Sequence, residues 1–166
     1  MTGGDSRGDS AEAEAQQTRT WIAHYGLRIT HRMKSRPPIG TVGQLTFTIS
    51  AEHVIDFASD GMPAVLSTPR LIAMIERTAR ESLGPFLDPD ERTVGIEIEL
   101  RHLAPTPLGA SVTCTTRVIQ AEGLQITLQV EARDARELIA RGLHKRAVIR
   151  LGSFSRRVAA KASPAS

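Results

Sequence analysis

Alternation between hydrophobic and polar residues dominates the chain from residue 42 onward, with one long interruption. Leu45, Phe47 and Ile49 alternate with polar residues, a period of two that is typical of a strand with one buried face. The same period recurs in residues 94–101 and 124–132, and residues 111–118 and 138–151 are also expected to be strands. Because turn-forming residues separate these segments, we predict five strands.

The interruption, residues 68–83, has a helical period. Its apolar residues recur every three or four positions, at Leu71, Ile72, Ile75, Ala79 and Leu83. We expect Thr68 to be the N-cap, its hydroxyl accepting a backbone N–H of the first turn, and Pro69 to take the first helical position. Gly84 and Pro85 then end the helix.

The order of these elements, one strand, one helix and then four strands, predicts an α+β fold and not an alternating parallel one. A long antiparallel sheet curled around a central, mostly buried helix satisfies this order best. The length of 166 residues fits one domain. We place that domain at residues 42–152, after a flexible N-terminal extension (1–41) that begins with a polar, Gly- and Ser-rich stretch and before a C-terminal tail (153–166).

Composition limits the cellular compartment and the kinds of partner that we expect for the protein. No apolar run approaches the ~20 residues of a membrane span, and the N-terminus lacks the apolar region of a secretory signal. Cys114 is the only cysteine, which excludes an internal disulfide and favours the cytoplasm. The net charge of +3 is scattered and only 4% of residues are aromatic, so we expect no nucleic-acid or membrane partner. The five histidines lack close ligand spacing, and we expect no metal and no cofactor.

Glu76 is the first candidate for chemistry, because it lies in the middle of the predicted helix with apolar neighbours. Residues 72, 79 and 83 on the same face are all apolar. A carboxylate in that setting loses hydration, so its pKa should rise, and it becomes a candidate general base or nucleophile. The alternative is a surface glutamate paired with Arg80 one turn further on.

Histidine and threonine side chains supply the other candidates. His102 continues the parity of the apolar positions in segment 94–101, so it should point to the apolar side of its strand; a hydrogen-bonded core histidine is the alternative. Thr68 has a sufficient explanation as an N-cap, but a helix start that borders a pocket would also favour negative charge on an oxygen. His144 and Arg146 share one parity and could face either a pocket or solvent.

Three segments together resemble one protein family. Residues 65–76 are similar to the helix start of the fluoroacetyl-CoA thioesterase family. Residues 93–95 with 101–109 resemble its histidine-bearing strand and the following turn, and residues 142–149 resemble its final strand. The similarity spans roughly residues 42–152, with the three segments in order at matching intervals.

The resemblance implies a hot-dog fold, in which an antiparallel sheet wraps around a central helix, and a homodimer with active sites at the subunit interface. It also implies that Thr68, Glu76 and His102 form the catalytic set. Gly95 matches a glycine near the substrate, and Arg146 matches an arginine close to the site. The stretch before Thr68 is shorter than the aromatic lid of the fluoroacetate-specific enzyme, so we do not expect that specificity here.

These features predict an acyl-CoA thioesterase that hydrolyses a small or medium acyl-CoA thioester to free acid and CoA. Glu76 would attack the acyl carbon or activate water, His102 would assist proton transfer and Thr68 would orient the site. The main alternative is a non-catalytic acyl-CoA binding module on the same fold. A hot-dog hydratase or dehydratase, and a regulatory protein that binds a partner through residues 19–36, are further alternatives.

Overall fold

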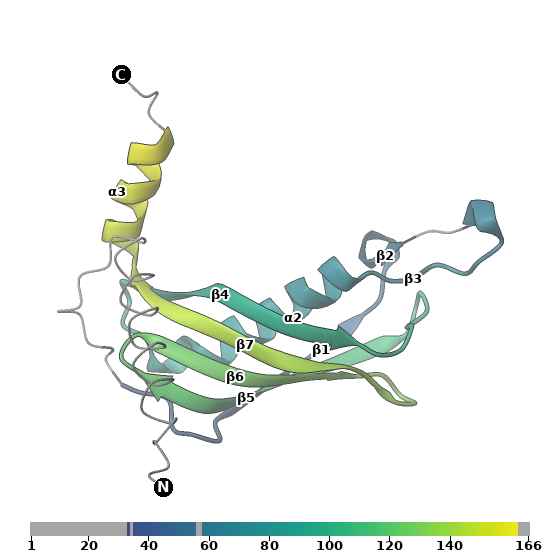
Figure 1. Ribbon diagram of the computed structural model, residues 1–166, viewed down its shortest axis with the longest axis horizontal. Helices are drawn as coiled ribbons and strands as arrows, with labels where there is room; N and C mark the ends of the chain where they lie inside the picture. Colours follow the sequence, from purple (N-terminus) through teal and green to yellow (C-terminus); the bar gives the residue numbers. More distant parts are fainter. Residues whose placement is uncertain (1–32, 34, 56–57, 163–166) are drawn as a thin grey trace, which may run out of the picture.

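A computed structural model describes residues 33, 35–55 and 58–162 of the chain (Figure 1). Most of the predicted N-terminal extension therefore lies outside the described residues. The main sheet contains five strands, which are β1 (Val42–Thr48), β4 (Glu91–His102), β5 (Ser111–Glu122), β6 (Gln125–Arg133) and β7 (Leu138–Arg150). The two longer helices are α2 (Thr68–Leu83) and α3 (Leu151–Ala162). Short elements complete the chain, namely the 3-10 turns Ala51–His53, Ala58–Asp60 and Gly84–Phe86 and the small ribbon of β2 (Val54–Ile55) and β3 (Val65–Leu66).

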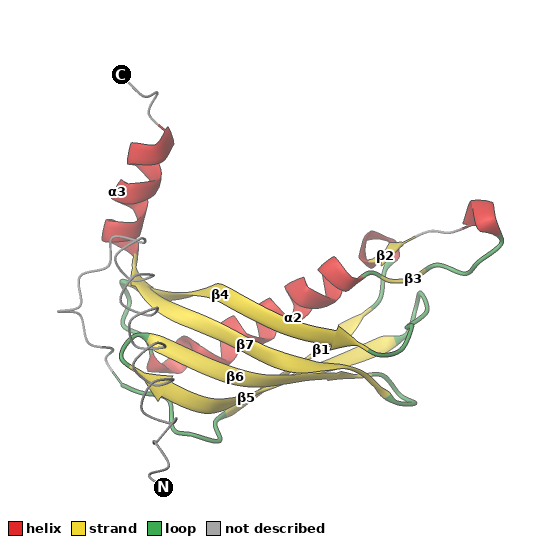
Figure 2. Cartoon of the chain, viewed as in Figure 1, coloured by secondary structure: helices red, strands yellow, loops and turns green. Residues whose placement is uncertain are grey.

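The five strands form one antiparallel sheet in the order β1-β5-β6-β7-β4, and α2 lies along one face of it (Figures 1 and 2). The α+β class, the five strands and the long helix that the sequence predicts are all confirmed. Because β1 and β4 lie at the two ends of this order, each has one edge without a partner strand within the described chain.

The hydrophobic core lies between α2 and the inner face of the sheet. Six helix residues are buried, namely Leu71, Met74, Ile75, Thr78, Ala79 and Leu83. They pack against the inward residues of the strands, among them Val112, Cys114, Leu128, Val130 and Val148. Burial of each large aliphatic side chain stabilises the fold by roughly 1.5–3 kcal/mol. The opposite side of α2 is exposed, so in the single chain the helix is buried on one face and not mostly buried as expected.

The start of α2 differs from the prediction by one residue. Ser67 is the N-cap, because its backbone is extended (φ −80°, ψ 145°) while its carbonyl accepts the first helical hydrogen bond from the N–H of Leu71. Thr68 is therefore the first helical residue, and Pro69 follows it in the first turn, where a missing N–H costs nothing. The Thr68 hydroxyl is left available for a contact outside the helix.

A β-bulge between Gly95 and Glu97 interrupts the regular alternation in β4. Gly95 pairs with Arg146 before the bulge, and Ile98 pairs with His144 after it, so Ile96 is an extra residue. Both partners on β7 face α2. The inward residues are consequently Thr93 and Gly95 on one side of the bulge and Ile98, Leu100 and His102 on the other, and the continuous parity expected from Val94 to His102 is wrong.

Helix α3 was not predicted, since residues 153–166 were expected to be a tail. It follows β7 directly and has no buried residue, although Leu151, Phe154 and Val158 recur at helical spacing. In Figure 1 it projects beyond the end of β7. Within the residues that the structure describes, no helix is long and apolar enough to cross a membrane.

Candidate active site

Glu76 lies at the centre of the site, where the middle of α2 faces β7. The Nη1 group of Arg146 donates a hydrogen bond to its Oε2, and Nε2 of His144 lies 3.1 Å from its Oε1. The side chains of Arg146 and His144 are 2% and 1% exposed, whereas that of Glu76 is 38% exposed. One side of the carboxylate is therefore held by buried groups while the other remains open. Glu76 pairs across the core with β7, and the alternative of a surface pair with Arg80 is not what the structure shows.

The two β7 side chains are themselves held by β4. Nε of Arg146 donates to the hydroxyl oxygen of Thr93 at 3.1 Å, and Nη2 donates to the Thr93 carbonyl at 2.9 Å. Nδ1 of His144 lies 2.9 Å from the carbonyl oxygen of Glu97, to which it donates. Because every nitrogen of the guanidinium has a partner, the orientation of Arg146 is fixed before any substrate binds.

The electrostatic state of Glu76 differs from the expectation. The hydrogen bond with His144 is the largest influence and lowers the pKa of the Glu76 carboxyl; burial opposes it, and Arg146 lowers it further, to about 2 from an ordinary 4.5. The expected rise in this pKa is therefore wrong. The sequence reveals the apolar neighbours of Glu76 on its own helix, but the compensating cation comes from a strand 70 residues away.

Gly95 packs directly against this carboxylate. A Cβ atom at residue 95 would lie 1.9 Å from Oε1 of Glu76, which would force the carboxylate to move, and 3.0 Å from Cε1 of His144, a tight contact. Glycine is thus required by close approach and not by backbone conformation. The structure thus brings Gly95, Glu76 and Arg146 together.

Thr68 and His102 form a separate pair at the N-terminal end of α2. The Thr68 hydroxyl and Nδ1 of His102 are 2.9 Å apart. Nε2 of His102 is buried and has no hydrogen-bond partner among the described residues. Burial lowers the pKa of His102, with a smaller opposing effect of a hydrogen bond to the backbone of Ala104, so the imidazole is favoured in its neutral form.

The three predicted catalytic residues do not form one compact cluster in the single chain. Thr68 contacts His102, but Glu76 lies eight residues further along α2, a displacement of ~12 Å along the helix axis. The site therefore consists of two parts, a hydroxyl–imidazole pair at the helix start and a carboxylate cluster at the helix centre.

Two members of the carboxylate cluster were missed or left undecided by sequence reasoning. Thr93 was not considered, because nothing in a strand sequence distinguishes a threonine that holds an arginine from one that fills a sheet. The sequence left open whether His144 faces a pocket or solvent, although its shared parity with Arg146 indicates that both side chains point to the same face. Two buried polar residues at alternate positions of one strand share a face and require hydrogen-bond partners there.

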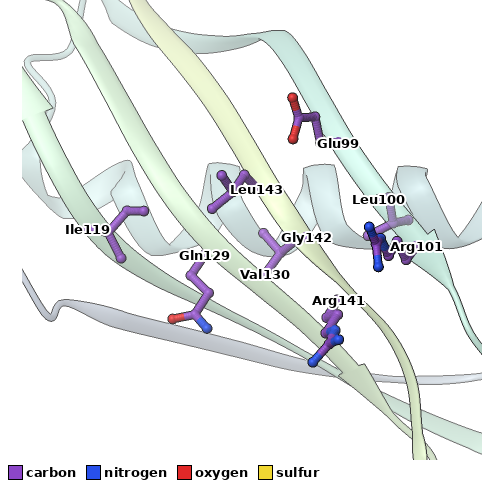
Figure 3. Close-up of a pocket in the computed structure, with 9 residues that line it drawn as sticks. All are labelled: Glu99, Leu100, Arg101, Ile119, Gln129, Val130, Arg141, Gly142 and Leu143. Carbon is purple, nitrogen blue, oxygen red and sulfur yellow. The ribbon is translucent and has the colours of Figure 1, made fainter. Parts of the chain in front are cut away.

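A groove of about 580 Å³ lies elsewhere, on the face of the sheet turned away from α2 (Figure 3). Glu99, Arg101, Gln129, Arg141 and Leu143 contribute to its walls. These residues alternate with the inward-facing positions of their strands, and none of the predicted site residues lines the groove. The groove is therefore separate from the carboxylate cluster.

Known proteins resemble the chain in both sequence and structure. Residues 49–151 match the model of the fluoroacetyl-CoA-specific thioesterase family. The fluoroacetyl-CoA thioesterase of Streptantibioticus cattleyicolor is 35% identical over 136 residues, which cover 82% of this chain and 92% of that enzyme. A solved fluoroacetyl-CoA thioesterase structure superimposes with a TM-score of 0.70 at 27% identity, covering 77% of this chain and 98% of its own. A hot-dog-like protein from Thermanaerovibrio acidaminovorans gives a TM-score of 0.70 at 27% identity, covering 77% of this chain and 95% of its own.

The antiparallel sheet, the helix along its inner face and these likenesses define a thioester hydrolase with the hot-dog fold. The fold and the class of enzyme that the sequence predicts are thereby confirmed. More narrowly, the chain belongs to the fluoroacetyl-CoA-specific thioesterase family.

Proposed function

We propose that the protein hydrolyses a small or medium acyl-CoA thioester to the free acid and CoA, with Glu76 as the reacting carboxylate. One observation supports this most directly, namely a partly exposed carboxylate held by buried Arg146 and His144 beside a glycine. A thiolate leaves readily, so such an enzyme needs mainly a positioned nucleophile and stabilisation of the oxyanion. Glu76 either attacks the acyl carbon or activates a water molecule for that attack.

Each remaining site residue has a role in this scheme. His102 assists proton transfer, which the bare ring nitrogen of a neutral imidazole permits, and Thr68 orients it through their shared hydrogen bond. Gly95 leaves room for the Glu76 carboxylate against β4 and so fixes where that carboxylate can meet the thioester. Arg146 acts on the substrate indirectly, by holding Glu76 in place, because all of its guanidinium nitrogens already have hydrogen-bond partners.

The acyl group that we propose is small or medium in size and is not restricted to fluoroacetyl. The relative from Streptantibioticus cattleyicolor is named for fluoroacetyl-CoA. In this chain, Phe57 is the only aromatic residue in the stretch from 56 to 65, and it lies outside the described residues. A site with little aromatic enclosure selects weakly between acyl groups that differ by a few atoms.

The proposed activity is tested by steady-state thiol release over a panel of acyl-CoA thioesters that includes acetyl-CoA, fluoroacetyl-CoA and medium-chain substrates. We expect turnover of several small or medium members, with no single sharp preference for fluoroacetyl-CoA. Binding without thiol release would contradict the proposal and favour the acyl-CoA binding module. Turnover of fluoroacetyl-CoA alone would contradict the proposed breadth of substrates.

We further propose that the active protein is a homodimer with its sites at the subunit interface. Two observations support a partner on this side of the molecule. The outer edge of β4, the 12-residue strand that carries Gly95 and His102, has no partner strand in the described chain. Thr68 is exposed, and Glu76 is open on one side, so both parts of the site lack a wall.

The oligomer is tested by light scattering coupled to size-exclusion chromatography. We expect a mass of about 36 kDa, twice the 18.0 kDa of one chain. Because each site would need both subunits, specific activity should fall when the protein is diluted below the dissociation constant of the dimer. A monomer of 18.0 kDa with full specific activity would rule out an interfacial site.

A further inference from the structure

The groove on the outer face of the sheet has no role in the proposed thioester chemistry, yet its size suits a small-molecule ligand. Its volume of about 580 Å³ falls within the roughly 300–1,000 Å³ that is usual for such sites. The side chains at its two ends differ in character. Arg101 and Arg141 lie at one end and Ile119 lies at the other, with Leu143 between them (Figure 3).

The cationic end of the groove consists of two arginines from neighbouring strands. Arg101 on β4 and Arg141 on β7 are directly opposite each other in the strand register, so their side chains leave the same face of the sheet. Both are exposed, and neither has a hydrogen bond or an ion pair within the described part of the chain. Glu131, the register neighbour of Arg141 on β6, pairs with Arg133 instead, at 3.9 Å. Like charges directly opposite each other destabilise a sheet, and a bound anion would remove this repulsion.

The opposite end of the groove is aliphatic because of an irregularity in β5. The register of β5 against β6 shifts between Val118 and Gln120, so Ile119 is an extra residue at a β-bulge. Val118 belongs to the core at 1% exposure, whereas Ile119 is 41% exposed. Leu143, which is 38% exposed, adds a second aliphatic side chain two residues along β7 from Arg141, a rise of ~7 Å. Ile119 lies two strands across from β7, a further ~10 Å.

The two ends together match a ligand that has one anionic head and an aliphatic chain. Two guanidinium groups on one face can both donate hydrogen bonds to a single carboxylate. An inorganic anion such as phosphate would contact the arginines but leave Leu143 and Ile119 exposed to water. A nucleotide base would stack on aromatic side chains, and none of the residues that line the groove is aromatic. The groove therefore favours an aliphatic carboxylate over both.

We propose that this groove is a binding site for a medium-chain fatty acid anion. The carboxylate lies between Arg101 and Arg141, the chain passes over Leu143, and its end reaches Ile119. The spacing of these residues sets the chain length, because a short acid would contact the arginines without reaching the bulge in β5. The inference is independent of the proposed hydrolysis, since the groove and the Glu76 carboxylate lie on opposite faces of the sheet.

Glu99 is the one charged residue of the groove wall that opposes an anion. It is the register partner of Leu143 and is two residues from Arg101 on the same face. In Figure 3 it lies beside the course of the chain and not between the two arginines. Two arginines against one glutamate leave the wall with a net charge of +1, so Glu99 weakens the attraction without cancelling it. Its removal consequently gives a test of opposite sign to removal of an arginine.

Isothermal titration calorimetry of the full chain with decanoate, acetate and decanol tests the class of ligand. Decanoate should bind, whereas acetate has the head alone and decanol has the chain without the charge. We expect each of these two to bind at least about 10-fold more weakly than decanoate. Acetate that binds as tightly as decanoate would show an anion site only, and decanol that does so would show an apolar patch only. Either result, or no binding of decanoate, would overturn the proposal.

Three single substitutions locate the binding. Arg141→Gln should weaken decanoate by at least about 10-fold, and Glu99→Gln should tighten it by about two- to fivefold. Lys145→Gln is the matched control, since it removes a positive charge from the same face of the same strand outside the groove. It should change the affinity by less than about twofold. Equal effects of Arg141→Gln and Lys145→Gln, or weaker binding in Glu99→Gln, would overturn the proposal, because the response would not come from the groove.

A second measurement on the wild type separates the groove from the candidate active site, which also binds a carboxylic acid if the proposed hydrolysis is correct. Two-dimensional ¹H–¹⁵N NMR spectra report which backbone amides shift when decanoate is added. We expect shifts at Gly142 and Leu143, which line the groove, and at Ile119. Shifts confined to the surroundings of Glu76, such as Gly95, would place the ligand in the active site alone and overturn the proposal.

Discussion

Glu76→Gln is expected to lose thioesterase turnover by at least about 10²-fold, the low end for removal of a positioned acid–base group. The amide keeps the size of the carboxyl but has no basic or nucleophilic oxygen. The loss should appear in kcat, because the acyl-CoA would still bind beside Gly95. Steady-state thiol release on the substrates turned over by the wild type measures this effect.

The same substitution should also lower stability. Arg146 is 2% exposed, and without Glu76 its buried charge keeps only neutral partners and the imidazole. Because Glu76 is itself partly exposed and water screens the pair, we expect a cost of about 1–2 kcal/mol, or roughly 3–8 °C in Tm. The folded-state pKa is depressed, so this difference should be complete above pH 4.5 and shrink as the pH falls toward 2.

Glu81→Gln is the matched control on the same helix. Glu81 forms an exposed ion pair with Arg77 at 2.9 Å, and its loss should cost at most about 0.5 kcal/mol and leave turnover unchanged. Near wild-type turnover in Glu76→Gln would remove Glu76 from the chemistry and favour an acyl-CoA binding role for the fold. Loss of turnover together with an increase in Tm would show that Arg146 does not depend on Glu76.

Gly95→Ala is the second change for which we expect a large effect. The new methyl group would lie 1.9 Å from Oε1 of Glu76, so the carboxylate must move away from its position beside His144. A displacement of about 1 Å in a positioned group can cost on the order of 10²-fold in rate. We expect kcat/KM to fall by about that factor, as measured with the same thiol-release assay, and the fold to be retained.

Gly43→Ala separates crowding of the helix from displacement of Glu76. A Cβ atom at residue 43 would lie 2.1 Å from Cβ of Ser82, so the methyl group pushes α2 at a point remote from the carboxylate cluster. This control should lower Tm while kcat per folded molecule stays at the wild-type value. If Gly95→Ala also lost only stability, Gly95 would be a packing residue of the sheet and the space beside Glu76 would have no role in turnover.

The fold could be predicted from the sequence because apolar residues recur with one spacing in the strands and with a distinct spacing in the helix. Alternation at Leu45, Phe47 and Ile49 and helical spacing in segment 68–83 identified the elements, and their order identified an antiparallel sheet. The bulge in β4 could not be predicted, because residues 94, 96, 98 and 100 are all apolar and the alternation continues across it. Helix α3 was missed, although Leu151, Phe154 and Val158 recur at helical spacing, because residue 151 was assigned to the preceding strand and the rest to a tail.

The site could be predicted in part, and its electrostatics could not. Similarity to a family pointed to Thr68, Glu76 and His102, and the structure places Thr68 against His102. The sign of the Glu76 pKa shift was predicted wrongly, because a helix sequence reveals the neighbours on that helix alone. Arg146 and His144 reverse the effect of burial from across the core, and only the strand register brings them there.

The bulge at Ile96 also changes which residues of β4 lie on the same face. Gly95 and His102 are seven residues apart, and in a regular strand an odd separation sends two side chains to opposite faces. Here both face α2, because the extra residue Ile96 has no partner residue in the register with β7. The two halves of the site, the carboxylate cluster and the hydroxyl–imidazole pair, therefore share one surface only through that additional residue. The inserted backbone unit, and not its side chain, keeps both halves of the site on the same face of β4.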